Sequence, residues 1–181
     1  MFCVGDKIDL RNTYFQYATN FSGDPERSRY RDSRRLCNIV IPDEALAREL
    51  SESNIKVGLS KPGPKDDPAT FVPKYFIPVQ AKYRKINGEP LTYQPRIYLV
   101  NDNGFPVLLD EETVGVIDNY RVTNVNALIN IGRNSRDPNG YYSLFIECMY
   151  VEGREKRRIE DPYAALYNQA DEPIPTPVPS M

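Results

Sequence analysis

Apolar and polar residues alternate along much of this chain, most regularly between residues 73 and 101. Apolar residues occupy every second position from Ile77 to Tyr83, and the residues between them become polar or cationic toward the end of the run. A period of two is typical of a β-strand that buries one face and exposes the other. An Asn87-Gly88 turn signal and a second run rich in aromatic and β-branched residues follow. The stretch therefore predicts a β-hairpin.

The two apolar faces predict the register of this hairpin. A two-residue turn would pair Val79 with Arg96 and place a cation on the apolar face. A loop of three or five residues pairs Val79 with Ile97 instead, so that the apolar faces coincide. Pro90 has no amide hydrogen for a tight turn, which also favours the longer loop. The other face then carries Phe76, Gln80, Lys82, Arg84, Thr92, Gln94, Arg96 and Tyr98.

This second face combines cations, amides and aromatic rings, which suits a phosphate backbone with unstacked bases. The alternative is an ordinary solvated face, because antiparallel sheets commonly expose one polar side. The loop from Ser22 to Arg35 favours the first interpretation, since it carries five Arg and Tyr30 against three acidic residues. Arginine can both pair with phosphate and stack on a base, so a loop of this composition can close over a nucleic-acid strand.

Similar patterns predict further elements along the chain. Residues 7–22 mix a first strand with the start of a loop. Pro42 opens a short helix that reaches about Glu49, and Asp110 or Glu111 begins a brief second helix. A turn at residues 102–104 leads into residues 105–109, and further strands are predicted at residues 36–41, 54–59, 121–133 and 141–151. The last of these is apolar on both faces and should therefore be central in its sheet.

The character of the chain changes after Gly153. Residues 154–158 are basic, and residues 159–170 predict one short helix. Residues 171–181 alternate Pro with other residues, which is typical of an extended, disordered tail. We therefore expect one domain over residues 1–153, followed over residues 154–181 by a basic and short helical segment and a Pro-rich, mildly acidic flexible tail.

Composition excludes several classes of protein. The net charge is −2 in 181 residues, so any nucleic-acid binding must come from a local patch. The chain has no His, which removes the commonest general base and metal ligand. Its three Cys are widely spaced without a CxxC pair, which indicates reduced thiols in a cytosolic compartment. No apolar run approaches the roughly 18 residues of a membrane span, and a signal-peptide pattern is absent.

Carboxylates leave one catalytic alternative open. A magnesium-dependent nuclease could be built on Glu111, Glu112 or Glu147. Helix N-capping explains the acidic cluster at residues 110–112 better, and an ion pair with a neighbouring cation explains Glu147 better. We therefore expect no catalytic residue, no metal ligand and no cofactor.

The order of several short motifs resembles that of one protein family. The motifs are Arg11-Asn12-x-Tyr14, Asn20-Phe21-Ser22-Gly23, the charged loop, Val40 to Glu44, Pro95 to Val100, Leu108 to Val114 and Leu144 to Val151. Across residues 11–152 this succession resembles the small single-stranded DNA-binding proteins of tailed bacteriophages and prophages, which have an OB-fold core.

The resemblance implies a mainly β fold: an OB-fold-like five-stranded antiparallel β-barrel with one or two short helices and a disordered C-terminal tail. It also implies a non-enzymatic protein that coats and protects exposed single-stranded DNA, without sequence specificity, during phage replication or recombination in the host cytoplasm. The tail would recruit replication or recombination proteins. The sequence departs from the family pattern at Ser143 and Glu147, where Lys is expected, around residues 130–132, which lack basic and aromatic residues, and in its Pro-rich tail.

Residues from three stretches are therefore candidates for contact with DNA. Cations would neutralise phosphates, and aromatic rings would stack on bases. A homo-oligomer is an open alternative because long apolar strands seek partners, and no membrane partner is expected. The other interpretations are a phage structural or assembly β-protein and the carboxylate-dependent nuclease. The candidate DNA-binding residues are Phe21, Arg27, Arg29, Tyr30, Arg31, Arg34, Arg35, Gln80, Lys82, Arg84, Arg96 and Tyr98.

Overall fold

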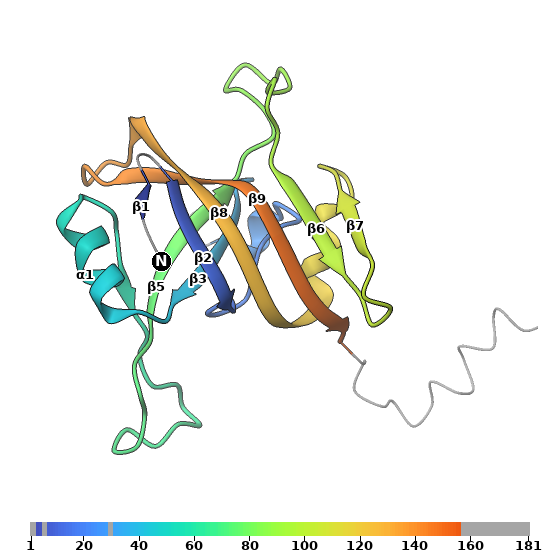
Figure 1. The fold of residues 1–181 in the computed structure, drawn as a ribbon. Coiled ribbons are helices and arrows are strands. Elements are labelled where there is room, and N and C mark those ends of the chain that lie inside the picture. The colour runs from blue at the N-terminus through green and yellow to red at the C-terminus, as the bar shows by residue number, and fades with distance from the viewer. Residues whose placement is uncertain (1–2, 5–6, 29–30, 157–181) are drawn as a thin grey trace, which may run out of the picture.

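The computed structural model describes residues 3–4, 7–28 and 31–156 of the chain. These residues form nine strands, one α-helix and two short 3₁₀ helices (Figure 1). The fold is mainly β, as the sequence predicts. The helix expected at residues 159–170 and the Pro-rich tail lie outside the described residues.

Five strands build a barrel. Hydrogen bonds join β2 to β8, β8 to β9, β9 to β5 and β5 to β3. After β2 the chain returns along β3, and two isolated bridges, Phe15 to Ile39 and Asn20 to Leu36, complete the barrel. The strands are β2 (Lys7–Thr13), β3 (Arg35–Ile41), β5 (Tyr75–Ala81), β8 (Tyr120–Arg136) and β9 (Tyr142–Glu155).

The order of these strands defines the class of fold. If the five barrel strands are numbered in chain order, they lie side by side around the barrel in the order 1, 2, 3, 5, 4 and back to 1. This is the strand order of the partly open OB barrel. The OB-like prediction is therefore confirmed. One detail differs from an all-antiparallel barrel, because the third and fifth strands, β5 and β9, run parallel.

Alternation along the strands explains the core. In β8 every second residue from Val125 to Ile131 is buried, whereas the Asn residues between them lie half-buried on the outer face. Ile8, Ile39 and Ile77 meet this row from three other strands and are fully buried. Each such side chain contributes about 1.5–3 kcal/mol by leaving water. As predicted, β9 is central, with neighbours on both of its edges.

Smaller elements surround the barrel. Asp43 caps the α-helix by accepting the amide of Ala45 at 2.9 Å, which agrees with the predicted helix start. None of the described helices is long and apolar enough to cross a membrane. The elements are β1 (Cys3–Val4), the 3₁₀ helix η1 (Pro25–Arg27), α1 (Glu44–Glu52), β4 (Gly58–Leu59), β6 (Arg96–Val100), β7 (Pro106–Leu109) and the 3₁₀ helix η2 (Val114–Asn119).

The hairpin predicted between residues 73 and 101 is wrong in its pairing. β5 does not pair with β6 but lies between β3 and β9. β6 pairs with β7 on one side and, in parallel, with the second half of β9 on the other. Val79 therefore lies opposite Cys37 rather than Ile97. The two runs were correctly predicted as strands, but they pair with other strands rather than with each other.

Candidate nucleic-acid interface

The arginine-rich loop between β2 and β3 is anchored to the barrel by one buried carboxylate. Asp118, in η2, has a side chain that is only 2% exposed. It accepts hydrogen bonds from the Thr19 hydroxyl at 2.7 Å and from the amides of Phe21 and Ser22 at 2.8 and 2.9 Å. Arg27 adds an ion pair at 3.3 Å. These contacts fix the start of the loop.

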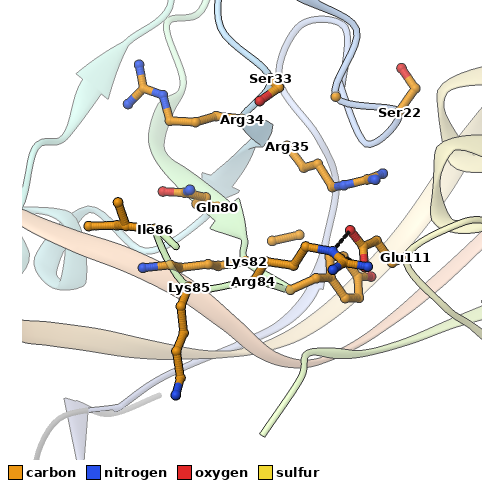
Figure 2. Close-up of a pocket in the computed structure, with 13 residues that line it drawn as sticks. Ser22, Ser33, Arg34, Arg35, Gln80, Lys82, Arg84, Lys85, Ile86 and Glu111 are labelled. Atoms are coloured by element: carbon orange, nitrogen blue, oxygen red, sulfur yellow. Dashed lines mark hydrogen bonds and ion pairs between the residues drawn. The ribbon is translucent and has the colours of Figure 1, made fainter. Parts of the chain in front are cut away.

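Beyond this anchor, the loop faces the end of β5 across a hollow of about 450 Å³. We call it the cationic hollow. Figure 2 shows Arg34 and Arg35 on one side of it and Lys82, Arg84 and Lys85 on the facing side. The fold thus brings together five of the predicted residues from two distant stretches. The lining residues are Ser22, Gly23, Ser33, Arg34, Arg35, Gln80, Ala81, Lys82, Tyr83, Arg84, Lys85, Ile86 and Glu111.

Arg84 is already paired within this hollow. Its Nε lies 2.8 and 3.0 Å from the two carboxylate oxygens of Glu111, and its Nη1 donates to the carbonyl of Gly88 at 3.0 Å. The hydrogen bond and charge of Glu111 raise the pKa of Arg84. A phosphate reaching Arg84 would have to compete with this carboxylate, so Arg84 offers less free charge than the sequence suggests.

Replacing Glu111 with Gln should therefore tighten single-stranded DNA binding several-fold. The change removes the anion that competes with phosphate for Arg84. Binding to a labelled oligonucleotide at two salt concentrations measures the effect. Glu112→Gln removes the same charge close by and is the matched control. Equal tightening in both variants would mean that net charge, rather than release of Arg84, is responsible.

Arg35 lines the hollow, and the backbone of Phe21 holds it there. Arg35 donates to the backbone carbonyl of Phe21, and its guanidinium lies 5.5 Å from the ring centre of Tyr83. Burial raises the pKa of Tyr83 to about 12. Phe21 itself is fully buried and packs against Phe15. The prediction that Phe21 offers a stacking face is therefore corrected, because its ring belongs to the core.

The turn between β8 and β9 adds a basic and aromatic group that sequence analysis missed. The guanidinium carbons of Arg133 and Arg136 lie 4.9 and 4.8 Å from the ring centre of Tyr142. Arg136 also donates to the Tyr142 hydroxyl at 2.9 Å, and both arginines lower the pKa of that phenol. The sequence did contain a signal for this group, which is an Asp-Pro-Asn-Gly turn flanked by two arginines and two tyrosines.

This group extends the interface along β3 and β5. A smaller hollow lies between the β8–β9 turn and these two strands, and we call it the tip hollow. Arg34 and Gln80 line both the tip hollow and the cationic hollow, so the two are continuous. Lys56, Tyr141 and Tyr142 complete the cationic and aromatic part of its lining.

The remaining candidate residues are dispersed. Arg27 pairs with Asp118, and Arg31 is exposed. Arg34, which lines the cationic hollow, pairs with Asp32 at 2.6 Å. Arg96 lines a separate groove, while Tyr98 stacks on Tyr150 at 4.5 Å on the outer face of β6 and β9. Arg29 and Tyr30 lie outside the described residues.

Asp110 and Glu147, from the acidic stretches considered for catalysis, have structural roles. Asp110 accepts the amides of Glu112 and Thr113 and so caps the turn before η2. Glu147 pairs with Lys7 at 2.8 Å, as the sequence predicts. In the part of the chain that the structure describes, no group of three or more acidic or Cys residues could hold a metal ion.

Comparisons with known proteins find similarity in structure. No protein-family model matches the sequence, and no curated protein matches it. The structure is similar to the single-stranded DNA-binding protein from bacteriophage Enc34, with a TM-score of 0.44, 11% identity and 90% of each chain covered. It is also similar to gp2.5, a single-stranded DNA-binding protein encoded by bacteriophage T7, with a TM-score of 0.37, 11% identity, and 94% of this chain and 98% of gp2.5 covered.

Both neighbours belong to the kind of protein that the sequence motifs resemble. The OB barrel is defined by its strand order, and the candidate interface by the residues that line it.

Proposed function

We propose that this protein binds single-stranded DNA without sequence specificity and has no enzymatic activity. One observation carries the proposal. OB barrels bind oligonucleotides on the face of their second and third strands and in the adjoining loops. Here those strands are β3 and β5, and the cationic hollow lies between the loop that precedes β3 and the end of β5.

The residues of this face suit a sequence-tolerant mode of binding. Lys82 and Arg35 are placed to neutralise phosphates, and Tyr141 and Tyr142 offer aromatic faces near the β8–β9 turn. Each stacked base would contribute about 1–3 kcal/mol, and the ionic part of the affinity should weaken steeply with salt.

A fluorescence-polarisation titration tests the proposal. The probe is a labelled oligo-dT of about 30 nucleotides, which exceeds the roughly 4–16 nucleotides that one OB fold covers. Binding is measured at low and moderate salt, with duplex DNA as competitor. We expect salt-sensitive binding that duplex does not displace. Failure to bind at low salt would reject the proposal.

The biological setting follows from the same proposal. A protein of this kind would coat and protect exposed DNA during phage replication or recombination, in the cytoplasm of the bacterial host. Residues 1–153 would form the DNA-binding unit. Residues from 160 to the end contain four acids and no Lys or Arg, and we propose that this tail recruits partner proteins.

A second candidate function is supported by the edge strand β7. In the described residues β7 pairs only with β6, and it exposes Val107 (52%) and Leu108 (57%) beside Phe105 (72%). Exposed apolar strand edges attract other chains, which suits a phage structural or assembly protein or a homo-oligomer. Such a protein would oligomerise without DNA in light scattering and would ignore oligonucleotides. Val107→Lys should then dissociate the oligomer.

A further inference from the structure

A second groove, of about 640 Å³, lies beside the OB face, between the segment 91–96 and the first half of β9. We call it the aromatic groove. Lys82 lines both this groove and the cationic hollow, so the two meet at one side chain. Its polar and aromatic lining consists mainly of Lys82, Tyr93, Gln94, Arg96, Asn130 and Phe145.

A row of residues across the sheet joins the OB face to this groove. Leu36 on β3 lies opposite Gln80 on β5, and Gln80 lies beside Phe145 on β9. Phe145 is in turn opposite Asn130 on β8, and Asn130 is opposite Lys7 on β2. All five are half-buried or exposed. The whole row curves around the closed barrel. Because neighbouring strands lie about 4.8 Å apart, the part that joins the OB face to the groove, from Gln80 through Phe145 to Asn130, spans roughly 10 Å.

Two aromatic rings give the groove faces that a base can use. Tyr93 is 92% exposed. The ring of Phe145 lies directly over Gly132, where an added Cβ would come within 2.7 Å of it. The glycine therefore lets this ring lie close to the sheet, and the ammonium of Lys82 stands 5.6 Å from the ring centre. A base has a π face that stacks on such rings.

The positive charge of the groove favours the binding of a phosphate group. Among the residues that the structure describes, neither Lys82 nor Arg96 is held in an ion pair. The one carboxylate in the lining, Glu147, is neutralised by Lys7 at 2.8 Å. Available positive charge thus sits next to exposed aromatic rings, and the amides of Gln94 and Asn130 add donors and acceptors.

We propose that the aromatic groove is a further nucleotide subsite, which takes an unstacked base together with its phosphate from a single strand. This inference rests on the proposed function and extends it. The bound strand leaves the cationic hollow, crosses Gln80 and Phe145, and enters the groove at Lys82. The binding surface is therefore longer than the OB face, and affinity rises with oligonucleotide length until the groove is filled.

The test compares two lengths of oligo-dT, about 6 and about 20 nucleotides. The first lies near the lower end of the roughly 4–16 nucleotides that one OB fold covers, and the second lies above that range. The variant is Tyr93→Ala combined with Arg96→Ala, both exposed positions whose loss should not disturb the core. We expect it to bind the longer oligonucleotide about tenfold more weakly than the unchanged protein. Binding of the shorter one should be unchanged.

The matched control is Phe105→Ala combined with Arg154→Ala. These changes also remove one exposed aromatic ring and one exposed cation, but neither residue lines the groove. The control should bind both lengths as the unchanged protein does. The inference is overturned if the Tyr93 and Arg96 variant binds the longer probe with normal affinity, or if its affinity falls equally for both lengths. The proposed function stands in either case. If the unchanged protein binds neither probe, the proposed function itself fails.

Discussion

Replacing Asp118 with Ala should lower the free energy of unfolding by about 3 kcal/mol and weaken DNA binding at the arginine-rich loop. The carboxylate is almost wholly buried and serves the Thr19 hydroxyl and two backbone amides. Removing it leaves those amides without acceptors inside the protein, and each buried unsatisfied donor costs about 1–3 kcal/mol. Arg27 loses its partner as well, so the start of the loop is no longer held in place.

Urea unfolding measures the loss of stability, and oligo-dT titration below the unfolding transition measures the loss of binding. Asp102→Ala is the matched control, because among the described residues Asp102 pairs only with the exposed Arg154, and such surface pairs contribute about 0–1 kcal/mol. Stability equal to that of the control would show that Asp118 does not anchor the loop. Normal DNA affinity in a destabilised variant would show that the position of the loop does not matter for binding.

The elements that the sequence predicts well are those whose signals are local. Alternation from Val125 to Ile131 identifies β8 because burial on one face repeats every second residue. Asp43 identifies the start of α1 because capping needs only a side chain two residues from an amide. Such signals require no knowledge of the rest of the fold.

Pairing between strands is not a local property, and there the prediction failed. The Asn-Gly turn forms as expected: Gly88 has a φ of 87° and its amide donates to Lys85. The strands on either side nevertheless diverge, because β5 and β6 lie side by side with different halves of the long strand β9. Parallel pairing over such a distance leaves no short sequence signature.

In the candidate site, too, some features have local sequence signals and others depend on the fold. Clusters of Arg in the loop and of cations after β5 are local signals, and the fold brings residues from both clusters to the lining of one hollow. The sequence could not show that Glu111 pairs with the guanidinium of Arg84, since the two residues are 27 positions apart. It also could not show that Phe21 turns inward while its backbone carbonyl binds Arg35. Whether a cation is available depends on distant carboxylates, which only the fold brings near.

Replacing Lys56, Lys82 and Lys85 together with Gln should weaken binding of oligo-dT by more than roughly tenfold at low salt and reduce its salt dependence. All three line the cationic or the tip hollow. Each phosphate contact to a single strand contributes about 0.7 to the slope of log K against log salt, so the slope should fall by about 2. Arg84 is left unchanged because Glu111 already holds its guanidinium.

Lys61, Lys65 and Lys74 supply the matched control for this variant. They are exposed, lie in the long loop before β5, and give the same change in net charge when replaced with Gln. That loop and the segment between β5 and β6 project from opposite ends of the barrel (Figure 1). If the slope of log K against log salt falls equally in both triple variants, the protein attracts DNA through its overall electrostatic field. A loss confined to the first variant would instead assign the phosphate contacts to the face of β3 and β5, because counterions are released only where the strand is bound.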